Sequence, residues 1–171
     1  NGSGIKTNVA FRVLAFPVVN TVSNYNFESG TEITITGNNL HDVTAVTLTD
    51  GGQGVTVVSK TKTELVLKFP ASTVSRSTLK IVNSTGAITT TQEFVNLSKA
   101  FVIFGEKYGE GFADGSWGDP GTITDKEAKS GTKSVFKNYQ KGNWHLINFA
   151  NWYPGVKDDG YKYLSFWVKG G

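Results

Sequence analysis

The chain contains no cysteine and no methionine in its 171 residues, and its four prolines stand against 20 glycines. Because cysteine is absent, the chain can form neither disulfides nor thiolate metal sites. Small secreted eukaryotic domains usually depend on disulfides, so their absence favours an exported bacterial protein. The excess of glycine over proline indicates many tight turns.

Long apolar runs and concentrated charge are also missing. No stretch approaches the roughly 20 apolar residues that a membrane helix requires. The net charge is only +3, with eight Lys/Arg against six Asp/Glu in residues 1–100 and nine against eight in residues 101–171. A nucleic-acid surface would need clustered basic residues, so we expect no nucleic-acid partner. The start, Asn1–Gly4, has neither an initiator methionine nor a signal peptide, and we interpret it as a processed or trimmed end.

Helical periodicity is nearly absent, and short segments instead alternate apolar and polar residues with period two. Four such segments are Glu32–Thr36, Val43–Leu48, Glu64–Lys68 and Thr78–Val82. In each of them the apolar side chains fall on one face, as in a half-buried strand, and turns rich in glycine or asparagine separate them. Strands of this length and spacing predict an all-β sandwich.

A change in composition divides the chain near residues 96–100. Residues 1–100 contain six aromatic residues, whereas residues 101–171 contain fifteen, including all four tryptophans. Threonine and valine dominate the first part, and glycine, lysine and aromatic residues dominate the second. We therefore predict two domains, residues 1–97 and residues 98–171.

The first domain contains a series of spaced anchor motifs. Pro17–Val19 is followed by Gly30–Leu40, which reads G-T-E-I-T-I-T-G-N-N-L, and later by Thr63–Pro70 and Leu79–Val82. Over about residues 15–95 this pattern resembles the IPT/TIG domain. The resemblance implies an immunoglobulin-like β-sandwich that serves as a spacer or an interaction surface and seldom performs chemistry.

Two residues of this domain carry further expectations. We expect Gly37, at the end of a predicted strand, to adopt a backbone conformation that other residues avoid. His41 follows in a turn and lacks partner residues, so we interpret it as a solvated surface side chain.

The second part contains two predicted strands, Phe101–Phe104 and Tyr161–Val168, and the run Ala128–Val135. The run reads A-K-S-G-T-K-S-V. Together with the later Y-x-x-L-S-F-x-V it resembles jelly-roll carbohydrate-binding modules of the galactose-binding-like superfamily. A jelly roll needs about eight strands, so we expect an incomplete β-sandwich here and a natural chain that continues past Gly171.

The order of the two modules resembles the surface glycan-binding proteins of bacterial polysaccharide-utilisation systems. This resemblance implies non-catalytic binding of a polysaccharide or oligosaccharide by the second domain, with the IPT/TIG domain as spacer. It also implies an extracellular or cell-surface location, as an outer-membrane lipoprotein, with transport or hydrolase proteins as partners.

Six residues of the second domain are candidates for contact with sugar. A sugar ring stacks its C–H face on an aromatic ring, and its hydroxyls need polar side chains nearby. The candidates are Trp117, Trp152, Tyr153, Asp114, Trp144 and Trp167. Trp117, beside Asp114, and the pair Trp152 and Tyr153 lie in turn-rich segments, where they either bind sugar or cover the ends of the sandwich.

The remaining tryptophans depend on which face of a strand they occupy. Trp167 and Tyr163 share one face of the predicted strand Tyr161–Val168. The opposite, aliphatic face consists of Leu164, Phe166 and Val168. We expect the aliphatic face to enter the core and the aromatic face to pack on another domain, with a sugar platform as the alternative. For Trp144 the alternation does not decide which face is exposed.

Metal binding has little support. Jelly-roll modules often hold a structural calcium, and Glu106 and the turn Lys129–Gly131 stand where the resemblance would put its ligands. Calcium needs about six to eight oxygen ligands, and too few are identifiable. We therefore expect no cofactor.

Catalysis also has little support. Glycoside hydrolysis needs two carboxylates, one with a raised pKa. The loop carboxylates are Glu110, Asp114, Asp119, Asp158 and Asp159. None of them stands in an apolar strand that would raise its pKa, and the chain lacks G-x-S-x-G, H-E-x-x-H and phosphate-loop motifs. We predict no enzyme activity; the alternatives to glycan binding are an accessory region of a secreted glycoside hydrolase and a protein-adhesion module.

Overall fold

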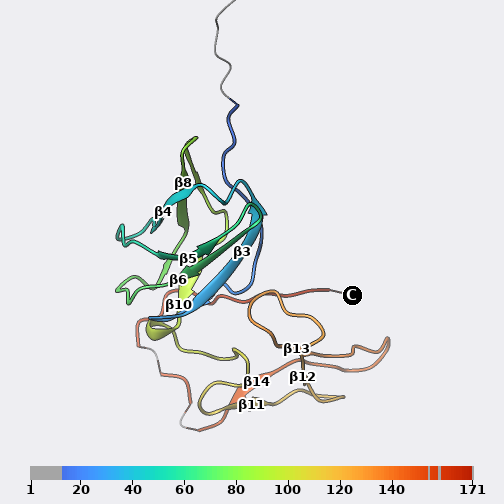
Figure 1. Ribbon diagram of the computed structural model, residues 1–171. Helices are drawn as coiled ribbons and strands as arrows, with labels where there is room; N and C mark the ends of the chain where they lie inside the picture. Colours follow the sequence, from blue (N-terminus) through green and yellow to red (C-terminus); the bar gives the residue numbers. More distant parts are fainter. Residues whose placement is uncertain (1–12, 154, 158, 171) are drawn as a thin grey trace, which may run out of the picture.

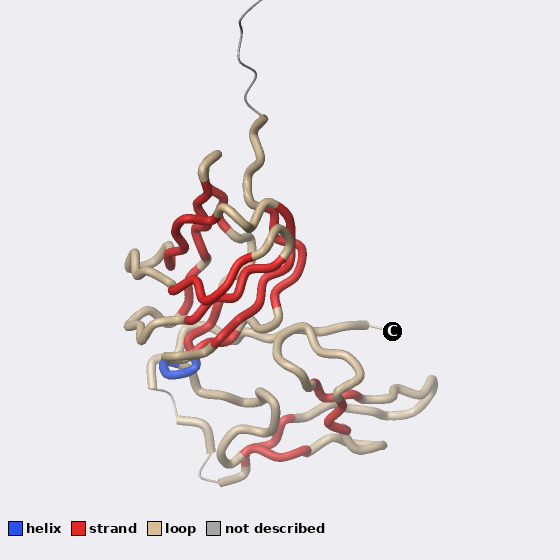
Figure 2. The backbone as a smooth tube through the Cα atoms, viewed as in Figure 1, coloured by secondary structure: helices blue, strands red, loops and turns tan. Residues whose placement is uncertain are grey.

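The computed structural model describes residues 13–153, 155–157 and 159–170. The chain ends on which the trimming and continuation predictions rest, Asn1–Gly4 and Gly171, lie outside the described residues. The described chain is all-β except for one short 3₁₀ helix, η1 (Leu97–Lys99). Figures 1 and 2 show a strand-rich first part and a second part in which long loops connect short strands. No helix within the described ranges has the length and hydropathy to cross a membrane.

Three sheets build the first part. The largest has the order β1-β3-β6-β5, and two smaller sheets have the orders β4-β8-β9 and β2-β10-β7. The strands are β1 (Val18–Val22), β2 (Asn26–Phe27), β3 (Glu32–Asn38), β4 (Val43–Leu48), β5 (Thr56–Lys60), β6 (Glu64–Lys68), β7 (Arg76–Ser77), β8 (Leu79–Asn83), β9 (Ala87–Thr89) and β10 (Phe94–Asn96). The four strands predicted from the period-two pattern are confirmed as β3, β4, β6 and β8.

The core of the first part lies between these sheets. Alternate residues of each strand point inward, so Ile33 and Ile35 of β3 and Leu65 and Leu67 of β6 are fully buried. Ile33 lies opposite Leu67 and Ile35 opposite Leu65 in the antiparallel ladder. Burial of each such side chain contributes about 1.5–3 kcal/mol. Three buried phenylalanine rings extend the core: Phe27, Phe69 and Phe94. The first part therefore has a hydrophobic core of its own.

Gly37 is required for a different reason from the expected one. Its φ angle lies outside the left-handed region, which is occupied nearby by Gly30 at 86° and Asn39 at 58°. A Cβ at position 37 would instead lie 1.7 Å from the carbonyl oxygen of Val18 in β1. The prediction of a special backbone conformation is therefore wrong, because the constraint is the close approach of two strands. His41 is exposed, as predicted.

The second part contains two small antiparallel sheets within the described residues. β11 (Phe112–Asp114) pairs with β14 (Phe149–Asn151), and β12 (Thr122–Thr124) pairs with β13 (Ser134–Phe136). Ala150 is the one hydrophobic residue beyond residue 100 that is buried in the described chain. The described second part thus lacks the layered core of the first, and the jelly roll stays a prediction.

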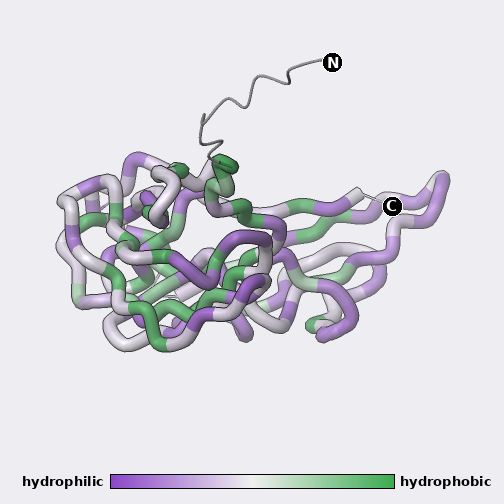
Figure 3. The backbone as a smooth tube through the Cα atoms, turned by 45° about the horizontal axis from the view of Figure 1, so that its top comes forward, coloured by the Kyte–Doolittle hydropathy of each residue, from purple (hydrophilic) through white to green (hydrophobic). Residues whose placement is uncertain are grey.

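Two strands predicted for the second part are wrong. Phe101–Phe104 makes only an isolated bridge, between Phe104 and Tyr108, and Tyr161–Val168 joins no ladder among the described residues. Figure 3 shows hydrophobic and hydrophilic residues mixed along the segment that leads to the C-terminus. That pattern suits a strand, but a strand also needs a hydrogen-bonding neighbour, which local sequence does not supply.

The expected burial of the aliphatic face of this C-terminal segment is wrong as well. Leu164, Phe166 and Val168 are 70%, 70% and 84% exposed. The segment lies without a sheet partner in the described chain, so no second layer covers these side chains.

A turn of the second part contacts the first part at Tyr25, whose carbonyl oxygen accepts a hydrogen bond from Val95 N (2.8 Å), two residues before η1. The Ser130 hydroxyl accepts a hydrogen bond from Tyr25 N (2.8 Å) and donates one to Asn24 Oδ1 (2.8 Å). Gly131 N donates to the carbonyl oxygen of Ser23 (3.2 Å). This turn therefore joins the two parts in addition to the covalent connection at η1.

Candidate functional site

The ribbon formed by β11 and β14 continues beyond its last ladder pair. Gly115 N donates to the carbonyl oxygen of Asn148 (2.9 Å), and Trp117 and Leu146 exchange two backbone hydrogen bonds of 3.0 and 3.2 Å. These bonds fix Trp117 and Leu146 opposite each other at the end of the ribbon. Trp117 is nevertheless 69% exposed, and Leu146 is exposed beside it.

The segment that follows β13 folds against this end of the ribbon. Lys137 Nζ donates to the carbonyl oxygen of Trp117 (2.8 Å), and the Tyr139 hydroxyl accepts a hydrogen bond from Ile147 N (3.1 Å). The ring centroids of Tyr139 and His145 are 6.2 Å apart. The exposed aromatic residues of this segment therefore have defined positions next to Trp117.

We use the name Trp117 surface for the four exposed apolar residues of these segments: Trp117, Tyr139, Trp144 and Leu146. Trp144 is 95% exposed, whereas His145 and Ile147 are half-buried. The structure thus shows that Trp144 lies on the exposed face of its segment, a question that the sequence pattern left open. Tyr139 was not among the predicted site residues, because a single aromatic residue in a polar run gives no periodic signal.

Polar side chains lie next to the Trp117 surface. Gln140 Nε2 donates to Asp119 Oδ2 (3.4 Å), and Gln140 Oε1 accepts a hydrogen bond from Asn143 Nδ2 (3.0 Å). Side-chain amides donate hydrogen bonds to hydroxyls and accept them, and carboxylates accept them. The arrangement therefore combines exposed aromatic rings with hydrogen-bonding groups at their edge.

Asp114 has a structural environment. Its Oδ1 accepts a hydrogen bond from Ser116 N (3.1 Å) and its Oδ2 one from Gly121 N (2.8 Å). Hydrogen bonds from the Ser116 side chain, and then from these backbone groups, hold the pKa of Asp114 below its ordinary value. The carboxylate therefore closes the loop that presents Trp117.

Trp152 and Tyr153 lie at the other end of the same ribbon. Phe112 pairs with Asn151, five positions along the strand from the pairing of Trp117 with Leu146. At about 3.3 Å per residue, Trp152 lies roughly 20 Å along the ribbon from Trp117. Trp152 is 85% exposed, and Tyr153 is exposed as well. The structure brings Trp144 to Trp117 but leaves Trp152 and Tyr153 apart from them.

Trp167 lies at the contact between the two parts. Its ring centroid is 5.5 Å from that of Tyr25, and Lys129 Nζ lies 5.5 Å from the Trp167 ring and 5.8 Å from the Tyr25 ring. Burial raises the pKa of Tyr25. Trp167 therefore packs on the first part. The sequence pattern favoured packing on another domain for the aromatic face of the segment Tyr161–Val168.

Glu106 lies beside the turn that ends at Gly131, the two places considered for calcium ligands. Its carboxylate accepts hydrogen bonds from Thr132 N (2.9 Å) and from the Thr132 hydroxyl (2.6 Å). No group of three or more His, Cys, Asp or Glu residues in the described chain could hold a metal ion. Glu106 therefore caps the turn by hydrogen bonds, and the expectation about cofactors stays a prediction.

The carboxylates considered for catalysis differ in their surroundings. Asp158 lies outside the described residues. Asp114 orders its own loop, and Asp119 bonds to Gln140. The absence of enzyme activity stays a prediction.

Residues 17–95 match the IPT/TIG domain family. The first part is therefore an immunoglobulin-like β-sandwich of this type, which confirms the resemblance seen in the sequence. No curated protein matches the chain.

Several solved structures resemble the chain at low identity. A structural genomics protein of unknown function from Bacteroides thetaiotaomicron is 16% identical, with a TM-score of 0.43 over 47% of this chain and 21% of that chain. A structure with xylogluco-oligosaccharide is 21% identical, with a TM-score of 0.42 over 70% and 27%. SGBP-B from a complex xyloglucan utilization locus in Bacteroides uniformis is 22% identical, with a TM-score of 0.42 over 70% and 34%. The chain spans about a third or less of each of these proteins, and likeness at this level assigns no ligand to it.

Proposed function

We propose that the chain binds polysaccharide without catalysis, through the Trp117 surface, and that the IPT/TIG domain holds this surface in place. The observation that supports the proposal most is the exposure of Trp117 and Trp144, at 69% and 95%, on segments that backbone hydrogen bonds fix in position. Large exposed aromatic groups bordered by polar side chains are typical of interaction sites.

The energetics fit weak, additive contacts with sugar rings. Covering one exposed aromatic side chain releases at most about 1.5–3 kcal/mol. Two stacked rings thus contribute about 3–6 kcal/mol before the entropy cost of association, so on their own they give a dissociation constant no tighter than about 0.04 mM. The four side chains are exposed, so the surface suits a polymer that runs across it better than a small molecule that must be enclosed.

The other predicted residues contribute differently to this proposal. Trp152 and Tyr153 stand about 20 Å away along the ribbon and lie outside the Trp117 surface. Asp114 acts through the loop it orders. Trp167 packs at the contact between the two parts.

A location outside the cell and partners in transport or hydrolysis form part of the same proposal. The support is the order of the two modules, an IPT/TIG domain followed by an aromatic-rich second part. A lipoprotein anchor would lie outside the described residues.

Protein adhesion is the second candidate function. An apolar patch with polar neighbours also suits a protein partner. A stable protein interface buries about 800 Å² on each side, which is more than the four side chains of the Trp117 surface provide. Glycan binding is therefore the better reading of a patch of this size.

The test is native affinity electrophoresis in gels that contain one polysaccharide each, with Trp117→Ala and Trp144→Ala compared with the unchanged chain. We expect at least one polysaccharide to retard the unchanged chain and both variants to lose about tenfold or more in affinity. Trp152→Ala is the matched control, because Trp152 is equally exposed but distant. Circular dichroism checks that each variant is folded.

Two outcomes would contradict the proposal. Lack of retardation by every polysaccharide would favour a protein partner. Retardation lost in Trp152→Ala but kept in Trp117→Ala and Trp144→Ala would move the site to the other end of the ribbon.

A further inference from the structure

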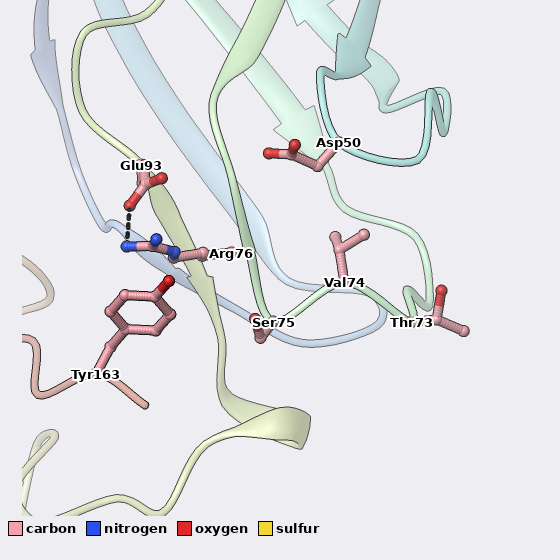
Figure 4. A pocket seen from close by; sticks show the side chains of 7 residues that line it. All are labelled: Asp50, Thr73, Val74, Ser75, Arg76, Glu93 and Tyr163. Atoms are coloured by element: carbon pink, nitrogen blue, oxygen red, sulfur yellow. Dashed lines mark hydrogen bonds and ion pairs between the residues drawn. The ribbon is translucent and has the colours of Figure 1, made fainter. Parts of the chain in front are cut away.

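An open pocket lies where the C-terminal segment crosses the first part (Figure 4). Its volume of about 460 Å³ lies within the range of roughly 300–1,000 Å³ that is typical of small-ligand sites. Its polar and aromatic lining consists of Asp50, Thr73, Ser75, Arg76, Glu93 and Tyr163. Tyr163 alone comes from the second part, so the pocket exists only because the two parts contact each other.

The Tyr163 ring is held in place before any ligand arrives. The guanidinium carbon of Arg76 lies 3.9 Å from the ring centroid, and Arg76 Nη1 pairs with Glu93 Oε2 at 3.0 Å. Four residues further on, Trp167 packs against Tyr25 and anchors the segment. Arg76 covers one face of the ring, yet Tyr163 remains 69% exposed. A ring fixed in this way loses little entropy when a ligand stacks on its other face.

Polar groups around this ring have unused hydrogen-bonding capacity. The Asp50 carboxylate and the hydroxyls of Thr73 and Ser75 have no hydrogen-bond partner among the described residues. A carboxylate accepts hydrogen bonds and hydroxyls both donate and accept, which complements the hydroxyl groups of a sugar. Figure 4 shows the Asp50 carboxylate on the far side of the pocket from Tyr163.

The charge of the pocket selects among sugars. Two carboxylates, Asp50 and Glu93, stand against the single guanidinium of Arg76. This net negative charge repels uronic acids and other anionic groups. The chemistry therefore fits a neutral sugar ring, stacked on tyrosine and bonded through its hydroxyls.

We propose that this junction pocket is a second glycan subsite, which binds one neutral sugar unit against the free face of Tyr163. The proposal rests on the proposed function, because it assigns a further contact to the same polysaccharide. It also gives the IPT/TIG domain a role in ligand binding beyond that of a spacer, since Asp50 and Arg76 belong to that domain.

The test measures affinity for soluble neutral polysaccharides (β-glucan, xyloglucan, galactan and xylan) by the same gel method and by isothermal titration calorimetry. The variants are Tyr163→Ala and Asp50→Ala, which alter opposite sides of the pocket. Tyr161→Ala is the matched control, because Tyr161 packs on Phe101 and does not line the pocket. We expect the first two variants to lose about 3- to 10-fold in affinity, through one stacking contact for Tyr163→Ala and hydrogen bonds to the carboxylate for Asp50→Ala, and the control to lose less than about 2-fold.

The outcomes separate this subsite from the proposed function. If the unchanged chain binds a neutral polysaccharide and Trp117→Ala weakens binding, but Tyr163→Ala and Asp50→Ala leave it unchanged, the subsite is overturned and the proposed function stands. If the unchanged chain binds none of the polysaccharides, both fail. Stronger binding of an acidic polysaccharide such as polygalacturonate by Asp50→Ala than by the unchanged chain would further support the assigned charge selection.

Discussion

Replacement of Gly37 by alanine tests the close approach of β1 to β3. The added Cβ would lie 1.7 Å from the carbonyl oxygen of Val18 and 2.8 Å from its carbonyl carbon. Contacts shorter than 3.0 Å are essentially never seen for real Cβ atoms. The obstacle is backbone, which cannot rotate away as a flexible side chain can. The β1 strand must therefore move by more than 1 Å.

The size of the effect follows from the contacts that β1 makes. Val19 lies opposite Gly37 and Val18 opposite Asn38 in the ladder between the two strands. A shift of this size breaks about two backbone hydrogen bonds, at about 1 kcal/mol each, and adds strain of about 1 kcal/mol or more. Alanine also lowers the conformational entropy of the unfolded chain, and this effect offsets about 0.4–1 kcal/mol of the loss in stability. We expect Gly37→Ala to lower the free energy of unfolding by about 2–3 kcal/mol.

Urea unfolding followed by circular dichroism measures this free energy, and thermal unfolding should show a melting temperature lower by about 5–10 °C. Gly54→Ala is the matched control, because no heavy atom lies within 4 Å of a Cβ at position 54. The control should stay within about 0.5 kcal/mol of the unchanged chain. A Gly37→Ala variant that also stays within this margin would refute the steric explanation.

Two further predictions concern the second part. Ser130→Ala removes two of the three hydrogen bonds that join its turn to the first part, so we expect a loss of about 1–2 kcal/mol in stability and faster hydrogen exchange at the Tyr25 amide; unchanged exchange there would contradict the contact. Because the pKa of Asp114 is lowered in the folded state, the stability it confers is present above its unfolded pKa of about 3.9 and is lost as the pH falls through the folded pKa. Asp114→Asn should therefore reduce the loss of stability between pH 5 and pH 2, as measured by urea unfolding at several pH values, and an equal loss in both chains would refute this linkage.

The strands of the first part could be predicted because their information is local. In β3 the apolar residues Ile33 and Ile35 alternate with polar ones, and this period alone gives both the strand and the side that is buried. The spaced anchors around Gly30 and Gly37 then identified the IPT/TIG type. The reason for Gly37 itself could not be predicted, since it depends on how closely β1, which lies 19 positions earlier at Val18, approaches β3.

Prediction of the site was incomplete for a similar reason. The sequence supplied the list of aromatic residues, including Trp117, Trp144 and Trp152, but gave no distance between them. The pairing of Trp117 with Leu146 across 29 positions joins Trp144 to Trp117 and separates both from Trp152. Tyr139 could not be predicted as a site residue, because only the fold of its loop brings it to the Trp117 surface.

The sequence by itself determined an all-β chain, an IPT/TIG domain in its first half and an aromatic-rich second part without cysteine. These properties depend on composition and on periods of a few residues, which the sequence displays directly. Tertiary structure alone decided that Tyr161–Val168 finds no sheet partner in the described chain, that Trp167 packs on Tyr25, and that Tyr163 completes a pocket with Arg76. Each of these depends on residues far apart in the sequence, whose contact is set by the packing of whole elements and not by the local pattern of either segment.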